Sequence, residues 1–375
     1  MGRLAAEAVD AGALGFTTSR SRNHTASDGR ITPSFSAEDA ELLGIAEAVG
    51  RTGKGVFEIN VDTVDVDGDL ALMRRVCEVS RRPLSMGLLQ RPGQPVDTYR
   101  RVLKGFEAAQ RDGLVMRGQV AARPTGLLMS RQGRVNPLAT SPTFRSLGDV
   151  ALLLHPDVRQ AILAELTGDA DMMTRFASAF ELGDPPRYDQ NPSESLAARA
   201  AAAGVAAKDL AYDIIAGGGF IYVPVSNYVE GDLRAVHEML VHALTVPGLS
   251  DGGAHCTMVA DFDYPTYLLG YWGRDAPDEL RIPVESVVKL QCADTAALVG
   301  LHDRGIVRPG LRADLNLIDL AAVGSTAPTL VDDLPGGGRR LVSRGTGYVA
   351  TIVRGQIAFE DGAHAGPMAG ALARV

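Results

Sequence analysis

The stretch VPGLSDGGAH, residues 246–255, joins a short apolar run to an aspartate and two glycines. The run Val246–Leu249 is typical of a buried strand, and Asp251 lies just beyond its carboxyl end. Gly252 and Gly253 let the backbone turn and approach a ligand closely. In a βα barrel the carboxyl ends of the strands form the active face, so Asp251 is predicted to be a metal ligand or a general base. An aspartate that caps the next helix or turn is the alternative.

Outward from this stretch, apolar strands alternate with helical segments. The sequence predicts strands near residues 12–19, 55–61, 83–90 and 114–120, and helices near 3–11, 40–49, 69–82 and 96–111. Such alternation is typical of a parallel sheet covered by helices. Residues 121–219 interrupt it with prolines and a helix near 156–167, which indicates a lid or specificity segment. A strand at 220–225 and a helix at 231–243 then lead into the stretch at 246–255.

The last part of the chain has a different pattern. Residues 305–319 are predicted to form a turn and an alternating strand, and residues 348–359 a strand followed by a hairpin-type turn at Asp361-Gly362. These are pieces of a small β domain. We therefore expect a barrel portion at 1–300, with a long insert at about 121–219, and a β-domain portion at 301–375.

Composition limits the class of partner and the compartment. The 375 residues suffice for a large barrel or two domains, and the net charge of −8 argues against nucleic acid. No apolar run reaches the about 18 residues that cross a bilayer, so no membrane is expected. Cys77, Cys256 and Cys292 form no CxxC motif, which indicates a reducing, cytoplasmic protein.

Several motifs together carry a family resemblance. The segment DTAALVGLHDRG, residues 294–305, with RPG at 308–310 and ADL at 313–315, resembles the exit from the barrel in the amidohydrolase superfamily. Residues 353–356 and 361–362 resemble the end of its C-terminal β domain. Residues 12–18 and Ser250-Asp251-Gly252 are similar to two strand motifs of the N-acyl-D-amino-acid deacylase family. The resemblance implies an α/β fold with a partial TIM-type (β/α)8 metal-dependent hydrolase barrel and a small C-terminal β domain.

The resemblance also implies a chemistry. Asp251 would be the metal-linked base that activates water for attack on an amide carbonyl. The bond that is cleaved would be a non-peptide C–N bond. Zinc would be the metal, and a small N-acylated amino acid the substrate.

Two departures from the family motivate an alternative. The family's His-x-His pair and early cysteine ligand are absent, so about three barrel strands are expected to precede Met1. The family's next two strands end in histidines, whereas residues 57–60 and 85–89 contain none, so one metal at most, or a differently built site, is expected. The alternative function is a truncated or degenerate non-catalytic binding scaffold. Open sheet edges would favour poor solubility or a homo-oligomer.

Polar residues near strand ends supply further candidates for substrate binding: His255, Asn60, Gln119, Arg123, Asn227 and Tyr228. Arg117 and Arg123 are an even number of residues apart, so both can face one side and clamp a carboxylate. Each candidate has an ordinary alternative, because strand-end residues often satisfy loop backbone and arginines are commonly solvated. His237 and His242 do not share a helix face, which argues against a helical metal site.

Overall fold

Five strands form one parallel sheet in the part of the chain that the structure, a computed structural model, describes: residues 1–26, 28–166, 176–250 and 255–374. Its order is β1-β2-β3-β4-β8, and every neighbouring pair is parallel. The strands are β1 (Gly15–Arg20), β2 (Val56–Val61), β3 (Leu84–Leu88), β4 (Met116–Val120) and β8 (Thr245–Pro247). The predicted parallel sheet is thus confirmed, and the stretch that begins at Val246 starts within its last strand.

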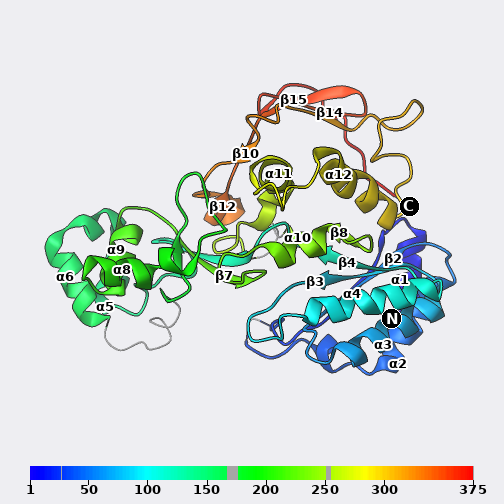
Figure 1. Ribbon diagram of the computed structural model, residues 1–375, viewed down its shortest axis with the longest axis horizontal. Coiled ribbons are helices and arrows are strands. Elements are labelled where there is room, and N and C mark those ends of the chain that lie inside the picture. The colour runs from blue at the N-terminus through cyan, green and yellow to red at the C-terminus, as the bar shows by residue number, and fades with distance from the viewer. Residues whose placement is uncertain (27, 167–175, 251–254, 375) are drawn as a thin grey trace.

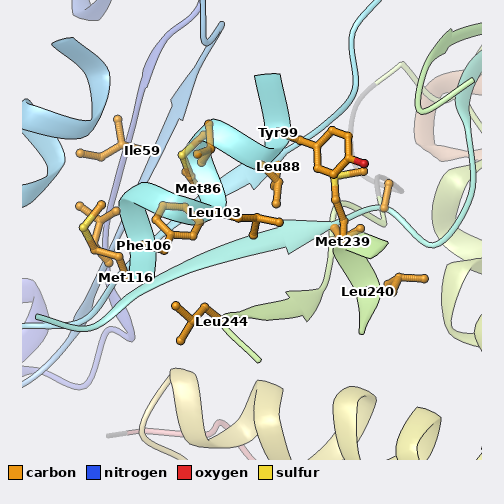
Figure 2. Close-up of a cluster of buried hydrophobic side chains, with 14 of the residues drawn as sticks. Ile59, Met86, Leu88, Tyr99, Leu103, Phe106, Met116, Met239, Leu240 and Leu244 are labelled. Carbon is orange, nitrogen blue, oxygen red and sulfur yellow. The ribbon is translucent and has the colours of Figure 1, made fainter. Parts of the chain in front are cut away.

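Helices alternate with the first four strands, as the periodicity predicts. They are α1 (Gly2–Asp10), α2 (Asp39–Gly50), α3 (Val66–Ser80) and α4 (Thr98–Arg111), and Figure 1 shows them grouped together beside the sheet. Helix α4 buries Tyr99, Val102, Leu103 and Phe106, whose three- and four-residue spacing makes one apolar stripe. Figure 2 shows this stripe against apolar side chains of the strands. Helix and sheet therefore share one core.

The alternation of side chains along β2 gives the sheet two different faces. Phe57, Ile59 and Val61 are buried among the apolar residues of the main core. Glu58 and Asn60 are half-buried and project from the opposite face, because successive side chains of a strand point to opposite sides. One face of the sheet is thus covered by helices, and the other carries polar groups.

The insert, together with the strand that follows it, forms a separate group of elements. Strands β5 (Thr125–Met129), β6 (Phe180–Glu181) and β7 (Ile221–Ser226) make a small antiparallel sheet, and Figure 1 shows α5 (Pro142–Ser146), α6 (Pro156–Glu165), α8 (Leu196–Ala203) and α9 (Ala207–Ala216) at one end of the molecule. Their apolar side chains form a core of their own. The helix and strand expected near 156–167 and 220–225 are both present, but β7 pairs antiparallel with β5 and β6.

Short helical segments surround the last strand of the main sheet. Helix α10 (Arg234–Leu240) precedes β8, and α11 (Tyr264–Tyr267), η5 (Leu268–Asp275), α12 (Val284–Val288), η6 (Lys289–Asp294) and α13 (Thr295–Leu298) follow it. Segments η5 and η6 are wound as π-helix. The indole of Trp272 in η5 donates a hydrogen bond of 2.6 Å to the carbonyl of Ala122, which ties this layer to the end of β4.

The C-terminal part is antiparallel, as predicted. A four-stranded sheet has the order β16-β15-β14-β9, with β9 (Leu315–Ile318), β14 (Tyr348–Val353), β15 (Gln356–Glu360) and β16 (Ala363–His364). Two further pairs are β10 (Gly324–Ser325) with β13 (Gly345–Thr346), and β11 (Thr329–Leu334) with β12 (Gly338–Val342).

One strand prediction in this part is wrong. Residues 348–359 are not a single strand, because the chain turns at Arg354 and Gly355, whose φ angles are 53° and 78°. Two successive positive φ angles are what a tight hairpin turn requires. The hairpin turn expected at Asp361-Gly362 is present between β15 and β16. The fold is a partial TIM-type barrel with a small antiparallel β domain, while a division at residue 300 stays a prediction.

Candidate functional site

A cavity of about 970 Å³ opens at the carboxyl ends of the parallel strands. Four strands of the parallel sheet line its wall, with Ser19 from β1, Asn60 from β2, Gly87 from β3 and Gln119 from β4 among their residues, and β5 and β7 line it as well. Leu249 and Ser250, which follow β8, complete this side of the wall. The carboxyl ends of parallel strands are where (β/α) barrels bind their ligands, so this cavity is the candidate active site.

Asp251 lies outside the described residues, but both of its described neighbours belong to the cavity. Ser250 and His255 line it from either side of residues 251–254. The hydroxyl of Ser250 donates a hydrogen bond of 3.0 Å to the carbonyl of Asp261. His255 has a φ of 56°, and its carbonyl accepts a bond of 2.8 Å from the amide of Met258. The last described residue before position 251 and the first described residue after position 254 therefore both lie at the cavity.

Asn60 and Gln119 also lie in the cavity wall, and each contacts a second polar residue. The amide nitrogen of Asn60 is 3.5 Å from the Nε2 atom of His24, which itself lines the cavity. Gln119 donates a hydrogen bond of 2.9 Å to the hydroxyl of Ser85. The fold brings these two residues and His255 together at one cavity, as their positions near strand ends predict, while their binding of a substrate stays a prediction.

Arg123 lies next to the cavity and is engaged within the protein. Its side chain is 1% exposed, with Nη1 3.0 Å from Asp261 and Nη2 2.7 Å from Asp263. The carbonyls of Pro124 and Ala260 accept two more hydrogen bonds, and the guanidinium carbon lies 3.5 Å from the ring centre of Tyr188. A guanidinium with these partners holds the chain after β8 in place. Neither Arg123 nor Arg117 is among the described residues that line the cavity, and Arg117, in β4, donates to the carbonyl of Met116.

Asp261 joins this buried pair to the cavity, since it also lines the wall. Burial raises the pKa of its carboxyl to about 6, against the opposing effect of the Arg123 charge. Asp261 and Asp263 are more than a hundred residues from Arg123 in the sequence. Neither aspartate is predicted from the sequence, because no local spacing links them to Arg123.

Asn227 and Tyr228 do not line the cavity. Asn227 is 1% exposed, and it exchanges two hydrogen bonds with the backbone of Gln90, of 2.7 and 2.8 Å. The hydroxyl of Tyr228 donates a bond of 2.9 Å to the carbonyl of Gln190 in the insert. The two residues thus connect the insert to the loop after β3. Their role in substrate binding stays a prediction.

Three further ionisable residues of the cavity are not predicted from the sequence: Glu58, Arg91 and His24. Glu58 shares a strand face with Asn60, so the alternation along β2 is a signal that could have found it. Arg91 lies just beyond β3, and its guanidinium donates a hydrogen bond of 3.4 Å to the carbonyl of Val61. His24 lies in a loop that Asp62 anchors by accepting from the hydroxyl of Ser21 at 2.5 Å and from the amide of Arg22 at 2.8 Å.

The fold and the cavity define a class of protein, the (β/α) barrels with a site at the carboxyl ends of their strands. The particular family follows from a family model described as the amidohydrolase family, which matches residues 1–359. The chain belongs to the amidohydrolase family. A comparison with curated proteins gave no match.

Solved structures of D-aminoacylase have a similar fold. A crystal structure of that enzyme has a TM-score of 0.56 and 19% identity, and the match covers 98% of this chain and 64% of the enzyme. A D-aminoacylase mutant with copper chloride, and a structure from work on the enzyme's binuclear metal centre, each have a TM-score of 0.56, 20% identity and the same coverage. This chain therefore spans about 64% of the length of the enzyme whose fold it shares.

The described residues do not supply the ligands of a binuclear metal centre. Residues 1–26, 28–166, 176–250 and 255–374 contain no group of three or more histidine, cysteine, aspartate or glutamate side chains placed to hold an ion. The carboxyl ends of β2 and β3 carry Asn60 and Leu88, and neither strand contains a histidine. Also within the described residues, no helix is long and apolar enough to cross a membrane.

Proposed function

We propose that the cavity at the strand ends hydrolyses the C–N bond of a small N-acylated amino acid, with Asp251 as the general base. The observation that carries this proposal is that Ser250 and His255, on either side of residues 251–254, both line the cavity. A carboxylate between them would take a proton from water as the water attacks the amide carbonyl, and would return it to the leaving amine. The family membership and the D-aminoacylase fold support the same reaction class.

Arg91 is proposed to bind the carboxylate of the substrate. Arg91 is the arginine among the described residues of the cavity wall. It donates one hydrogen bond of 3.4 Å to the carbonyl of Val61, which leaves most of its N–H donors available to a ligand. Arg123, the candidate from the sequence, is already paired with two aspartates. A fixed fork of donors suits a carboxylate.

No step of this proposal passes through a metal, because the described residues do not fit the family's centre. D-aminoacylase, which shares the fold, has a binuclear metal centre. We extend metal dependence to this chain only as a proposal, with zinc as the expected ion and Asp251 as the expected ligand.

The test is hydrolysis of N-acetyl-D-amino acids by the chain and by Asp251→Asn, with elemental analysis of both proteins. We expect release of the free amine to fall by at least about 100-fold in the variant, the scale on which a lost general base lowers a rate. Near-stoichiometric zinc that is lost in Asp251→Asn would support the metal-linked form of the proposal. Equal rates in the two proteins would refute Asp251 as the base.

A second candidate, a binding protein without catalysis, is favoured by one observation. Neither β2 nor β3, whose carboxyl ends carry Asn60 and Leu88, contains a histidine. Such a protein would bind N-acetyl-D-amino acids in calorimetry without releasing amine, and would contain no metal with or without Asp251. The two candidates thus differ in turnover and share the cavity.

A further inference from the structure

Glu58 projects from the polar face of β2 into the floor of the cavity. In the register of the sheet it lies between Thr17 of β1 and Ser85 of β3, one side-chain layer below Asn60. Thr17 is exposed, and the hydroxyl of Ser85 is already engaged by Gln119. The neighbours on both sides are therefore small and neutral, and space above Glu58 belongs to the cavity.

The Glu58 carboxyl has no partner in the described part of the chain. Burial alone raises its pKa, and no hydrogen bond or opposite charge acts to lower it. Removing a carboxylate from water without a compensating partner costs free energy. A half-buried, unpaired carboxyl at the bottom of a cavity is thus a group that a ligand can satisfy.

No cation of the described residues forms an ion pair with Glu58. Arg117 occupies the same layer on β4, two strands away and so about 10 Å across the sheet. The charge that acts on Arg117 is that of Asp294, and burial lowers the pKa of its guanidinium. Arg123 is shared between Asp261 and Asp263, which leaves that buried trio with one more acid than base. Arg91 lines the same wall and donates one hydrogen bond, to the carbonyl of Val61.

We propose that Glu58 binds a cationic group of the ligand, so that the cavity selects N-acylated amino acids whose side chain ends in an amine or a guanidine. The N-acyl part of this inference rests on the proposed function, whereas the binding of a cation by Glu58 does not. A ligand with its carboxylate at Arg91 and its cation at Glu58 would use the two charged groups of the wall that lack ionic partners in the described chain.

The test measures binding of two matched probes, n-pentylamine and n-pentanol, by ligand-observed NMR at pH 7, where an alkylamine is protonated. We expect the amine to bind about tenfold more tightly than the alcohol, the scale of one charge-assisted hydrogen bond. Glu58→Gln keeps the shape of the side chain and removes its charge, so it should abolish this preference and leave binding of the alcohol unchanged. Glu285→Gln makes the same change at an exposed site on α12 and should keep the preference.

Equal binding of the two probes by the parent chain would overturn the inference, as would a preference for the amine that survives in Glu58→Gln. Thermal unfolding of each variant shows whether it is folded, and unchanged alcohol binding shows that the cavity is intact. Hydrolysis of N-acetyl-D-lysine and N-acetyl-D-norleucine then separates the two proposals. A Glu58-dependent preference for the amine without hydrolysis of either compound would refute the proposed function and keep this inference. Hydrolysis of both compounds at equal rates would support the proposed function and refute the selection of cationic side chains.

Discussion

At the scale of single residues, the buried guanidinium of Arg123 ties the chain after β8 to the end of β4. Replacing it by methionine in Arg123→Met leaves Asp261 and Asp263 buried without their cation. Breaking a buried ion pair from one side typically costs about 3–5 kcal/mol, so we expect the free energy of unfolding to fall by about 4 kcal/mol. Urea denaturation followed by circular dichroism measures this loss.

Arg100→Met is the matched control for that prediction. Arg100 pairs with Glu238 at 2.7 Å, but its side chain is 54% exposed. Exposed ion pairs contribute little because solvent screens them, so Arg100→Met should lose far less stability than Arg123→Met. Similar losses in the two variants would contradict a special role for the buried guanidinium and would restore substrate binding as the better hypothesis for Arg123.

The residues of the site are predictable where one strand shows them and not where distant segments meet. Asn60 and Gln119 can be found because each lies near the end of a strand, and β2 and β4 end as predicted at the cavity. Arg123 lies near the site as predicted, yet its partners come from the segment after β8. Spacing in the sequence relates only neighbours along the chain, so it cannot reveal a contact that the fold creates.

At the scale of elements, the pairing of β1 with β2 requires glycine at position 15. A Cβ atom there would lie 1.8 Å from the carbonyl oxygen and 2.7 Å from the amide nitrogen of Val56, and both are backbone atoms that cannot move alone. Gly15→Ala should therefore force the two strands apart and lower the free energy of unfolding by about 3 kcal/mol, as measured by urea denaturation.

Gly44→Ala provides the opposite case with the same chemical change. Gly44 lies in α2, and a Cβ atom there meets nothing within 4 Å. Alanine in an exposed helix is favoured over glycine by about 0.5–1 kcal/mol, so this variant should be slightly more stable than the parent. A loss of stability at position 44 as large as that at position 15 would mean that strand contact is not the cause.

Elements with a clear period are predicted well, and elements defined by their partners are not. The stripe on α4 and the alternation on β2 are written in consecutive residues. The partners of β7 cannot be found in this way, because an antiparallel strand that pairs with the insert and a parallel barrel strand share the same apolar composition. The turn at Arg354-Gly355 escapes prediction because arginine is an uncommon residue at positive φ.

At the scale of the whole molecule, the parallel sheet formed by the described residues ends in two outer strands. Within residues 1–26, 28–166, 176–250 and 255–374, β1 and β8 are the outer strands, and each pairs on one side only. An open edge presents unpaired backbone donors and acceptors to any other strand. A twofold axis between two copies would pair β1 with its own counterpart in antiparallel orientation.

We therefore expect the chain to self-associate, and sedimentation velocity at a series of concentrations measures this directly. A lysine on an edge strand opposes pairing because its charge would be desolvated there, so Leu14→Lys, at an exposed position directly before β1, should shift the distribution toward monomer. Ala202→Lys adds the same charge on the exposed surface of α8 and should leave the distribution unchanged. A parent chain that stays monomeric and unfolds cooperatively at every concentration would refute the prediction, because it would mean that the open edges do not need a partner strand.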